Sequence, residues 1–432
     1  IVSSAAAPEH SMRPSAPVLA LAFALALTCV VHVEALDNGV ALLPPMGWVT
    51  WCTNGDGIIP CLNDFCNETE VQSIAYAMAT NGMKDAGYEY INLDDCWAGE
   101  RLANGSIRAD TSRFPSGTLA PLADYVHSLG LKLGLYTDVG TTTCKNDRPG
   151  SWGYYQEDAD TYAEWGIDFV KMDWCDHPGN ETAPELYGQM RDALNATGRP
   201  MVFSICEWGL YRPWTWGPFT GNMWRVGPDH LPLWWTPETN QDPGQGQGTA
   251  NIIEHMAGLS RFAGPGAWND PDFLMTGLVA EGLIYNSDVE WTTEFSFWSL
   301  FASPLIVSSD IRDMTSEMST ILLNDEVIAV NQDSLAIAGD RREKSGLAEV
   351  WSKPLSGSKW AAILYNNEIL PFGASTNVTL QFNSSHLPGW TYGSSAAIRD
   401  LWAHEDLGVF DGSYTVNLDP HNCVMLLVEQ GN

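Results

Sequence analysis

The chain has 432 residues, 45% of them hydrophobic, and 19 tryptophans, which excludes a disordered protein and allows one large core or two ordinary ones. Its formal net charge of −32, with only 21 lysines and arginines, argues against nucleic acid or an anionic membrane as partner. Such acidity suits an acidic compartment and equally serves plain solubility.

The first 35 residues have the pattern of an export signal. Met12-Arg13 precedes an apolar run over residues 18–31 and a small-residue end at Val33-Glu34-Ala35, so the mature chain is expected to start near Leu36. Residues before Met12 resemble translated upstream sequence. No later segment is long and apolar enough to span a membrane. The pattern predicts a protein of the secretory pathway, either extracellular or lysosomal or vacuolar.

Glycosylation sequons and cysteines agree with export. Asn-x-Ser/Thr acceptors occur at Asn67, Asn104, Asn180, Asn195, Asn377 and Asn383. Of the nine cysteines, Cys29 lies in the signal, and the other eight would enter an oxidising compartment.

Strand-like runs alternate with helical patterns along most of the chain. The strands are expected at residues 46–51, 90–95, 131–138, 167–175, 201–207, 222–225, 266–273 and 304–309. Helices are expected at residues 70–86, 121–129, 156–165, 184–195, 249–262 and 289–301. Eight such units predict an α/β fold with a closed (β/α)₈ TIM barrel. A doubly wound open sheet is the alternative, but no Gly-rich nucleotide fingerprint follows the first strand.

The pattern changes near residue 331. Short runs at residues 350–351, 360–365, 378–382 and 424–428 are separated by Gly, Pro, Ser and Asn, without helical periodicity. We therefore expect residues 36–330 to form the barrel and residues 331–432 a C-terminal antiparallel β-sandwich.

Charged side chains follow the predicted strands. Lys171 and Asp173 share one face of the strand at residues 167–175, which indicates an active site or, alternatively, a structural ion pair at a strand end. Other strands end in the same way, and catalytic groups of such barrels come from the carboxyl ends of several strands. The residues concerned are Asp94, Asp95, Tyr136, Asp138, Glu207, Trp208, Arg225, Asp229, Asp270 and Asp272.

Two kinds of site fit this ring of carboxylates. A divalent-metal site would use the hard oxygen ligands, but neither His-Glu-x-x-His nor His-x-His is present in the sequence. A sugar site would use the carboxylates for hydroxyl groups, tryptophan faces for the ring and two carboxyl groups for the chemistry. We favour the sugar site and expect no metal and no cofactor.

The sequence closely resembles glycoside hydrolase family 27, the α-galactosidases and α-N-acetylgalactosaminidases. The matching stretches run in family order from residue 36 to past residue 331: LDNG at 36–39, PMGW at 45–48, DAGYEY at 85–90, DDCW at 94–97, RFP at 113–115, KLGLY at 132–136, KMD at 171–173, CEW at 206–208 and WNDPD at 268–272. This resemblance implies a retaining double-displacement hydrolase, with Asp173 as nucleophile and Asp229 as acid/base. Such a pair is expected about 5–5.5 Å apart.

The resemblance also implies the roles of other residues. Asp94 and Asp95 would bind the 4- and 6-hydroxyls, Lys171 a neighbouring hydroxyl, and Arg225 with Asp272 the 2- and 3-hydroxyls. Trp51 and Tyr136 would wall the pocket, and Trp208 is a further ligand contact. Glu207 and Leu210 stand where α-galactosidases carry larger residues that crowd the 2-position, which points to galactose. The intact Asp94-Asp95 pair argues against an arabinopyranosidase.

The chain departs from the family pattern in a few places. Phe273 replaces a common Met, and Gly227-Pro228 before Asp229 is unusual. The family's disulfides would be Cys52–Cys96, Cys61–Cys66 and Cys144–Cys175. Asn222 stands where a Cys often stands, which leaves Cys206 and Cys423 free.

Two other functions stay open at this point. An α-N-acetylgalactosaminidase would carry small residues at positions 207 and 210, and a galactose-binding lectin would be expected to have lost Asp173 or Asp229. The expected partner is an α-galactoside substrate, with a homodimer as one expected assembly.

Overall fold

The computed structural model describes residues 36–53, 65–237, 246–278 and 287–431, which belong to one compact unit. The expected export signal and Cys61 lie outside these ranges. Within them no helix is long and apolar enough to cross a bilayer.

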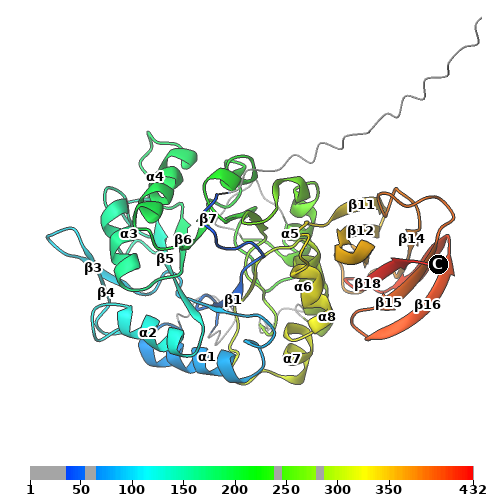
Figure 1. Cartoon of the computed structure of the whole chain (residues 1–432), viewed down its shortest axis with the longest axis horizontal. Coiled ribbons are helices and arrows are strands. Elements are labelled where there is room, and N and C mark those ends of the chain that lie inside the picture. The colour runs from blue at the N-terminus through cyan, green and yellow to red at the C-terminus, as the bar shows by residue number, and fades with distance from the viewer. Residues whose placement is uncertain (1–35, 54–64, 238–245, 279–286, 432) are drawn as a thin grey trace, which may run out of the picture. The chain divides into compact units, whose positions relative to one another are not determined.

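A parallel sheet closes on itself, as the alternating pattern predicted (Figure 1). Its ends meet through a bridge between Leu274 and Val307, where the Leu274 N–H donates to the Ile306 carbonyl at 2.8 Å. The eight strands in sheet order are β10 (Leu305–Val307), β1 (Met46–Val49), β2 (Tyr90–Asn92), β5 (Lys132–Asp138), β6 (Phe169–Asp173), β7 (Val202–Cys206), β8 (Met223–Arg225) and β9 (Trp268–Asp270).

Helices cover the outside of this barrel (Figure 1). They are α1 (Glu68–Thr80), α2 (Ala120–Ser128), α3 (Tyr155–Glu164), α4 (Ala183–Ala196), α5 (Thr249–Met256), α6 (Asp288–Leu300), α7 (Ser316–Leu322) and α8 (Asp325–Asn331). In α1 the apolar stripe Val71, Ile74 and Met78 is buried, as expected. The helix ends before the predicted residue 86, because Gly82 adopts φ +98° and breaks the helical backbone.

The barrel has two apolar layers. One cluster lies inside the strands and includes Tyr90, Phe169, Val202, Met223 and Trp268. Leu131, Leu133 and Leu135 belong to a separate cluster with residues of the helices. Along β5 the alternation of faces is therefore the predicted one, and it carries Tyr136 toward the interior.

The sequence did not predict a hairpin between β2 and α2. Strands β3 (Ala98–Arg101) and β4 (Ile107–Ala109) pair antiparallel around a turn that contains Asn104. The strands are only four and three residues long, too short for their periodicity to reveal them.

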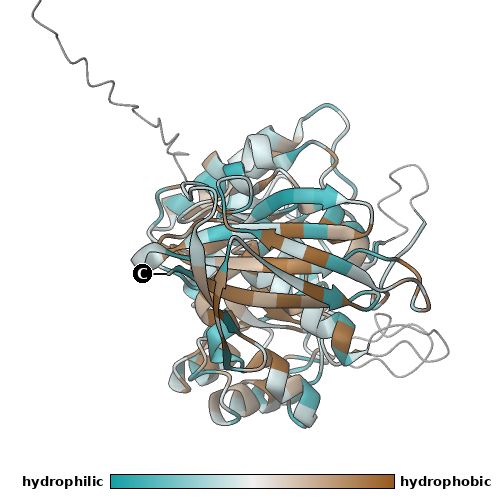
Figure 2. Ribbon diagram, turned by 90° about the vertical axis from the view of Figure 1, so that its right-hand side faces the viewer, coloured by the Kyte–Doolittle hydropathy of each residue, from teal (hydrophilic) through white to brown (hydrophobic). Residues whose placement is uncertain are grey.

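The C-terminal part consists of antiparallel sheets, as predicted. Brown and teal segments alternate along its strands where they face the viewer in Figure 2, and the apolar side chains form a cluster between the sheets. The larger sheet has the order β11 (Asp340–Ser345), β12 (Ala348–Leu355), β13 (Lys359–Asn366), β18 (Cys423–Gln430), β15 (Ser395–Asp400) and β16 (Glu405–Asp411), and the smaller one pairs β14 (Thr376–Gln381) with β17 (Ser413–Leu418).

The disulfides correct part of the expected pairing. Cys144–Cys175 is present, but Cys66 is bonded to Cys96, so the expected pairs Cys52–Cys96 and Cys61–Cys66 are wrong. Cys66 immediately precedes α1, and its Cα lies 6.1 Å from that of Cys96, within the usual range for a disulfide. Cys52 takes part in another disulfide.

Cys206 and Cys423 are free and buried, as expected. The side chain of Asn222, which stands where the family often has a cysteine, accepts a hydrogen bond from the Phe203 N–H and donates to the Gly266 carbonyl.

Candidate active site

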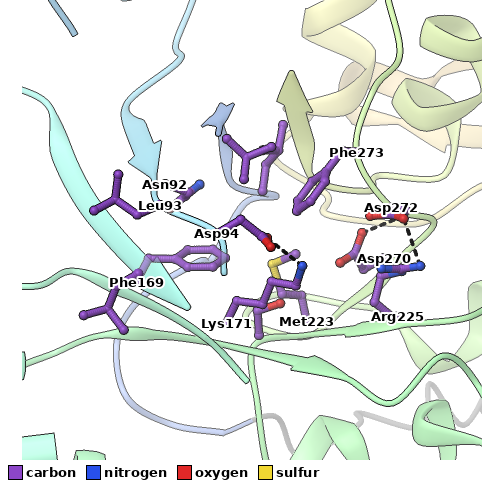
Figure 3. Close-up of a pocket in the computed structure, with 14 residues that line it drawn as sticks. Asn92, Leu93, Asp94, Phe169, Lys171, Met223, Arg225, Asp270, Asp272 and Phe273 are labelled. Atoms are coloured by element: carbon purple, nitrogen blue, oxygen red, sulfur yellow. Dashed lines mark hydrogen bonds and ion pairs between the residues drawn. The ribbon is translucent and has the colours of Figure 1, made fainter. Parts of the chain in front are cut away.

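A cavity of about 290 Å³ opens at the carboxyl ends of the barrel strands. It is lined by Trp51, Asp94, Asp95, Tyr136, Cys144, Lys145, Lys171, Asp173, Cys175, Trp208, Arg225, Asp229, Asp272 and Phe273. The cavity thus brings together the residues to which the family resemblance assigns roles, with two exceptions, Glu207 and Leu210. Of the other strand-end carboxylates, Asp270 lines the recess below it and Asp138 lines neither. A narrower recess continues into the barrel below it, where Figure 3 shows Lys171 and Arg225 pointing toward carboxylates on two sides.

Asp173 ends β6, and the fold fixes both of its oxygens. The Trp174 N–H donates to Oδ1 and the Tyr136 hydroxyl donates to Oδ2, each at 3.0 Å. Burial raises the pKa of Asp173 to about 7, and the charges of Asp229 and Asp94 add to this while Lys171 opposes it. The carboxylate is therefore oriented by two donors and largely shielded from solvent.

Asp229 lies on the loop after β8, next to the most buried cation of the site. Arg225 Nη2 lies 3.1 Å from Asp229 Oδ1 and 2.9 Å from Asp272 Oδ2. The Asp229 side chain keeps 42% of its surface accessible, whereas Arg225 and Asp272 keep 3% each. Burial raises the pKa of Asp229, and Asp272 adds to this while Arg225 opposes it. Of these carboxyl groups, Asp229 is the one open to a substrate.

A second ion pair lies between β6 and the end of β2. Lys171 Nζ lies 2.7 Å from Asp94 Oδ2, and the side chains are 14% and 5% exposed. Burial alone would lower the pKa of Lys171, but Asp94 and other nearby anionic groups outweigh it and raise the pKa well above its usual value. The ammonium is therefore charged at every working pH.

Asp95 lies beside this pair in a different environment. Its Oδ2 accepts the Lys145 N–H at 3.2 Å, and its Oδ1 is buried without a hydrogen-bond partner in the described part of the chain. Burial and the neighbouring Asp94 raise the pKa of Asp95 to about 6. This Oδ1 lies 4.0 Å from Arg148 Nη1, an ion pair without a hydrogen bond, so the oxygen can still accept one from a ligand hydroxyl.

Aromatic rings line the sides of the cavity. Lys171 Nζ lies 5.3 Å from the Tyr136 ring centre and 4.9 Å from that of Phe273. Trp208 adopts φ +57°, a conformation that is unusual for a large side chain. The following Gly209 has φ +77°, and a Cβ there would lie 2.3 Å from the Val226 carbonyl oxygen. Only glycine fits at position 209, so the backbone at Val226, directly after β8, fixes the course of the loop that presents Trp208.

Glu207 and Leu210 lie away from the cavity lining. Glu207 is fully buried, its Oε2 accepts the Tyr211 N–H at 2.7 Å, and burial raises its pKa to about 8. Leu210 is 40% exposed. Glu207 therefore closes the turn that carries Trp208, and the expected crowding of the 2-position by these residues stays a prediction.

Sequence reasoning missed two residues of the site. Lys145 lines the cavity, with its Nζ 5.6 Å from the centre of the Trp51 ring. His230 lies behind the cavity, and its backbone N–H donates to Asp272 Oδ2 at 2.8 Å. Both lie on loops, where no strand periodicity indicates which side chains turn inward.

A metal centre finds little support in the donor set. Among the described residues, three or more His, Cys, Asp or Glu ligand atoms lie within 4.8 Å of one another only at Asp138, Cys144 and Cys175. The two sulfurs there form a disulfide. The Asp138 oxygens accept the Gly140 N–H at 2.7 Å and the Cys175 N–H at 2.9 Å, so this carboxylate is already engaged in holding the loops.

A (β/α)₈ barrel with two carboxyl groups lining one cavity, paired cations and aromatic walls defines the class of glycoside hydrolases. Comparison with known proteins specifies which kind. A family model described as alpha galactosidase A matches residues 43–333, and a second, described as alpha galactosidase C-terminal beta sandwich domain, matches residues 345–428. The chain belongs to the α-galactosidases of glycoside hydrolase family 27, whose mechanism is retaining, and it hydrolyses terminal α-galactosyl residues.

Individual relatives agree with this assignment. A probable α-galactosidase of Dictyostelium discoideum is 42% identical over 94% of this chain and 98% of its own. Human α-galactosidase A is 40% identical over 82% of each chain. The crystal structure of α-galactosidase I from Mortierella vinacea superposes with a TM-score of 0.82 at 33% identity, covering 91% of this chain and 98% of the other.

Proposed function

We propose that Asp173 and Asp229 carry out the hydrolysis, as nucleophile and as acid/base. The observation that supports this most directly is the difference in exposure between these two carboxyl groups, which line the same cavity. Asp173 is held by two donors and is 7% exposed, whereas the Asp229 side chain is 42% exposed and faces the open space. A nucleophile needs a fixed oxygen, and an acid/base needs access to the leaving group and to water.

The reaction then has two steps. An Asp173 oxygen bonds to the anomeric carbon while the bond from that carbon to the leaving oxygen breaks, and Asp229 protonates that oxygen. Water then attacks the anomeric carbon, Asp229 accepts its proton, and the bond to Asp173 breaks. Burial raises the pKa of both carboxyl groups, and the negative charge of Asp229 adds to the rise at Asp173. The proposed cycle requires one proton on the pair at its start, carried by Asp229.

The sugar would be held by the groups around this pair. Asp94 and Asp95 are proposed for the 4- and 6-hydroxyls, Lys171 for a neighbouring hydroxyl, and Arg225 with Asp272 for the 2- and 3-hydroxyls. Two buried acceptors without a hydrogen bond support this arrangement, since Asp95 Oδ1 and Asp272 Oδ1 have no hydrogen-bond partner in the described ranges. Trp51, Tyr136 and Trp208 would contact the ring faces.

Chemical rescue with azide tests both assignments. Asp173→Gly should lose at least ~10³-fold in kcat on an aryl α-galactoside, and azide should restore turnover with an inverted galactosyl azide as product. Asp229→Gly should instead yield the azide with retained configuration, because its covalent intermediate still forms. If the two variants gave the opposite products, the two roles would be exchanged.

The choice of sugar is tested in the same assay. We expect wild-type enzyme to cleave an aryl α-galactoside and to leave the corresponding α-N-acetylgalactosaminide intact. Substituting Glu207→Ser and Leu210→Ala would admit the larger sugar if these residues limit the 2-position. No gain in the double variant would mean that Trp208 and Arg225, which line the cavity themselves, set the selectivity.

For location, we propose a glycosylated, exported protein found outside the cell or in a lysosome or vacuole. Two disulfides support an oxidising compartment. Among the sequons, Asn104, Asn180, Asn195 and Asn377 are exposed, whereas Asn67 caps α1 and its Nδ2 donates to Glu70. Peptide mapping after deglycosylation is expected to find glycan at the exposed four. A homodimer is proposed as one assembly, to be checked by light scattering.

A further inference from the structure

One loop of the barrel faces both carboxylate oxygens of Asp95. The Lys145 N–H donates to Oδ2 at 3.2 Å, and Arg148 Nη1 lies 4.0 Å from Oδ1. This loop joins β5 to α3 and is anchored by the disulfide between Cys144 and Cys175. The Asp95 and Arg148 side chains are 3% and 9% exposed, so water and salt screen their interaction only weakly.

Backbone contacts close this loop around Arg148. Thr142 and Pro149 form an antiparallel β-bridge, and the Thr143 N–H donates to the Arg148 carbonyl at 3.0 Å. These contacts fix the backbone at Arg148, and with it the origin of the side chain that extends to Asp95. The approach of the guanidinium to this carboxylate is therefore a property of the folded loop.

Arg148 has two carboxylates beside it in the described ranges, and they differ in exposure. Its Nη1 lies 2.8 Å from Asp147 Oδ1, but that side chain is 60% exposed, so solvent weakens the ion pair. The Nε of Arg148 is buried without a hydrogen-bond partner in the described ranges. A guanidinium stays charged inside a protein, and a buried charge requires a nearby opposite charge. Asp95 is the buried carboxylate that supplies it.

Most other groups around Asp95 disfavour its negative charge. Burial is the largest cause and Asp94 the next, and they raise the pKa of Asp95 to about 6, while Arg148 opposes the rise. Tyr136 and Asp138, at the end of β5, also interact electrostatically with Asp95. Among these groups Arg148 is the cation, so it is the side chain that favours an ionised Asp95.

The ionised form of Asp95 is the better acceptor for a substrate. A carboxylate accepts stronger hydrogen bonds than a neutral carboxyl group does. Because Arg148 lies beyond hydrogen-bond distance of Oδ1, it stabilises the charge without occupying this oxygen. The Lys145 ammonium lies at the cavity wall, 5.6 Å from the centre of the Trp51 ring.

We propose that Arg148 is a positioning residue for substrate recognition, which keeps Asp95 ionised and in place as an acceptor for a hydroxyl group of the terminal galactose. Arg148 itself does not line the active-site cavity. The proposal rests on the substrate-binding role proposed for Asp95, and removal of the Asp95 charge tests that role separately.

The test is calorimetric binding of galactose to the full-length protein at several pH values. In Arg148→Met the Asp95 carboxyl should stay protonated to higher pH. The ratio of the variant's Kd to that of wild type should be about 10 at pH 5 and approach 1 at pH 8, as expected for the loss of one opposite charge within 4–6 Å. Arg191→Met is the control, because it removes the arginine of another adjacent pair, Arg191–Asp192, outside the active-site cavity.

Two further variants separate charge from folding. Arg148→Lys keeps the positive charge and should restore most of the wild-type pH dependence. Arg148→Gln keeps a hydrogen-bond donor for Asp147 but no charge, so it should show the same pH-dependent loss of binding if Arg148→Met proves unstable. A loss of affinity that is the same at every pH, or that Arg148→Lys shares in full, would overturn the proposal.

Asp95→Asn distinguishes failure of this proposal from failure of the proposed function. We expect it to weaken galactose binding at least ~10-fold, after which Arg148→Met should change Kd less than about 2-fold at any pH. Wild-type affinity in Asp95→Asn would remove the role of Asp95, and the proposal with it. Weak binding in Asp95→Asn together with a full additional loss from Arg148→Met would overturn the role of Arg148 alone.

Discussion

Lys171 Nζ lies 2.7 Å from Asp94 Oδ2, and on the same face of β6, two residues further on, stands Asp173. A single lysine thus pairs with a carboxylate assigned to the substrate and lowers the pKa of the carboxylate assigned to the chemistry. Both side chains of this ion pair are nearly buried, so removal of one partner would leave the charge of the other without solvation by water.

Lys171→Met should therefore be costly in two ways. Leaving Asp94 buried and unpaired should lower the free energy of unfolding by about 3–5 kcal/mol. The loss of a positive charge beside Asp173 should also move the acidic limb of the kcat/KM profile to higher pH. Urea unfolding and pH–rate profiles measure the two effects.

A matched control lies on the neighbouring strand. Lys132 Nζ is also 2.7 Å from a carboxylate, Glu89 Oε1, but those side chains are 43% and 44% exposed. Lys132→Met should cost less than about 1 kcal/mol. Equal losses of unfolding free energy in the two variants would show that burial does not decide what each ion pair contributes.

The pH dependence of the reaction should reveal the coupling of the two catalytic carboxyl groups. Burial, followed by the negative charge of Asp229, raises the pKa of Asp173 to about 7. Asp229→Asn removes that charge, so the Asp173 carboxyl should ionise at lower pH. With a dinitrophenyl galactoside, whose leaving group needs no proton, the acidic limb of kcat/KM should move to lower pH than in wild type. An unmoved limb would show that the two groups titrate independently.

Stability should fall as pH rises through neutrality, and Glu294 is one cause. Burial raises its pKa to about 8, from an ordinary 4.5, while its oxygens accept the Met275 N–H and the Thr276 hydroxyl. A raised folded-state pKa gives stability that is complete below pH 4.5 and is lost as pH approaches 8. Glu294→Gln should thus reduce the fall in Tm between pH 5 and pH 8 by a few degrees.

The exposed Glu317, on α7, provides the control for this experiment. Glu317→Gln should leave the pH dependence of Tm over this interval as in wild type, because that carboxylate is ionised throughout in both the folded and the unfolded chain. A Glu294→Gln variant with the wild-type slope would mean that other carboxyl groups, such as Glu207, account for the effect.

The barrel could be predicted because each of its strands has a helix or a loop signal before it and a polar residue after it. The two-residue alternation of β6 and β5 predicted that Lys171, Asp173 and Tyr136 point inward. This alternation of side-chain direction holds even where both faces of a strand are buried. Strand β16 escaped prediction for the opposite reason. Its residues Glu405–Asp411 are largely exposed, and its apolar residues Leu407, Val409 and Phe410 do not keep a two-residue period.

Contacts between residues that lie far apart in the sequence could not be predicted from periodicity. Cysteine spacing alone allows many connectivities, and the family resemblance led to two wrong pairs around Cys66 and Cys96. Lys145 reaches the cavity from a loop after β5, where the Cys144–Cys175 bond sets the course of the chain. His230 directly follows Asp229 in the sequence, but no sequence pattern showed that it contacts Asp272 and Phe273 after β9.

We expect His230 to have the largest effect on catalysis among the residues that do not contact the substrate. It is fully buried, and its ring joins two loops: Nδ1–H donates to the Phe273 carbonyl at 2.9 Å, and Nε2 accepts from the Thr249 hydroxyl at 3.0 Å. Its backbone N–H donates to Asp272 Oδ2, and it directly follows Asp229. Burial lowers the pKa of His230 to about 4, so the ring is neutral at working pH.

His230→Phe should keep the ring volume but leave the Phe273 carbonyl and the Thr249 hydroxyl without this partner. We expect kcat on an aryl α-galactoside to fall roughly 10- to 100-fold, because a small displacement of Asp229 misplaces its proton, with a much smaller change in KM. Thr249→Val, which removes only the Nε2 partner, should show a milder loss in the same direction. A purely structural role predicts instead a lower Tm with unchanged kcat in the folded fraction, and that result would remove His230 from the positioning of the acid/base.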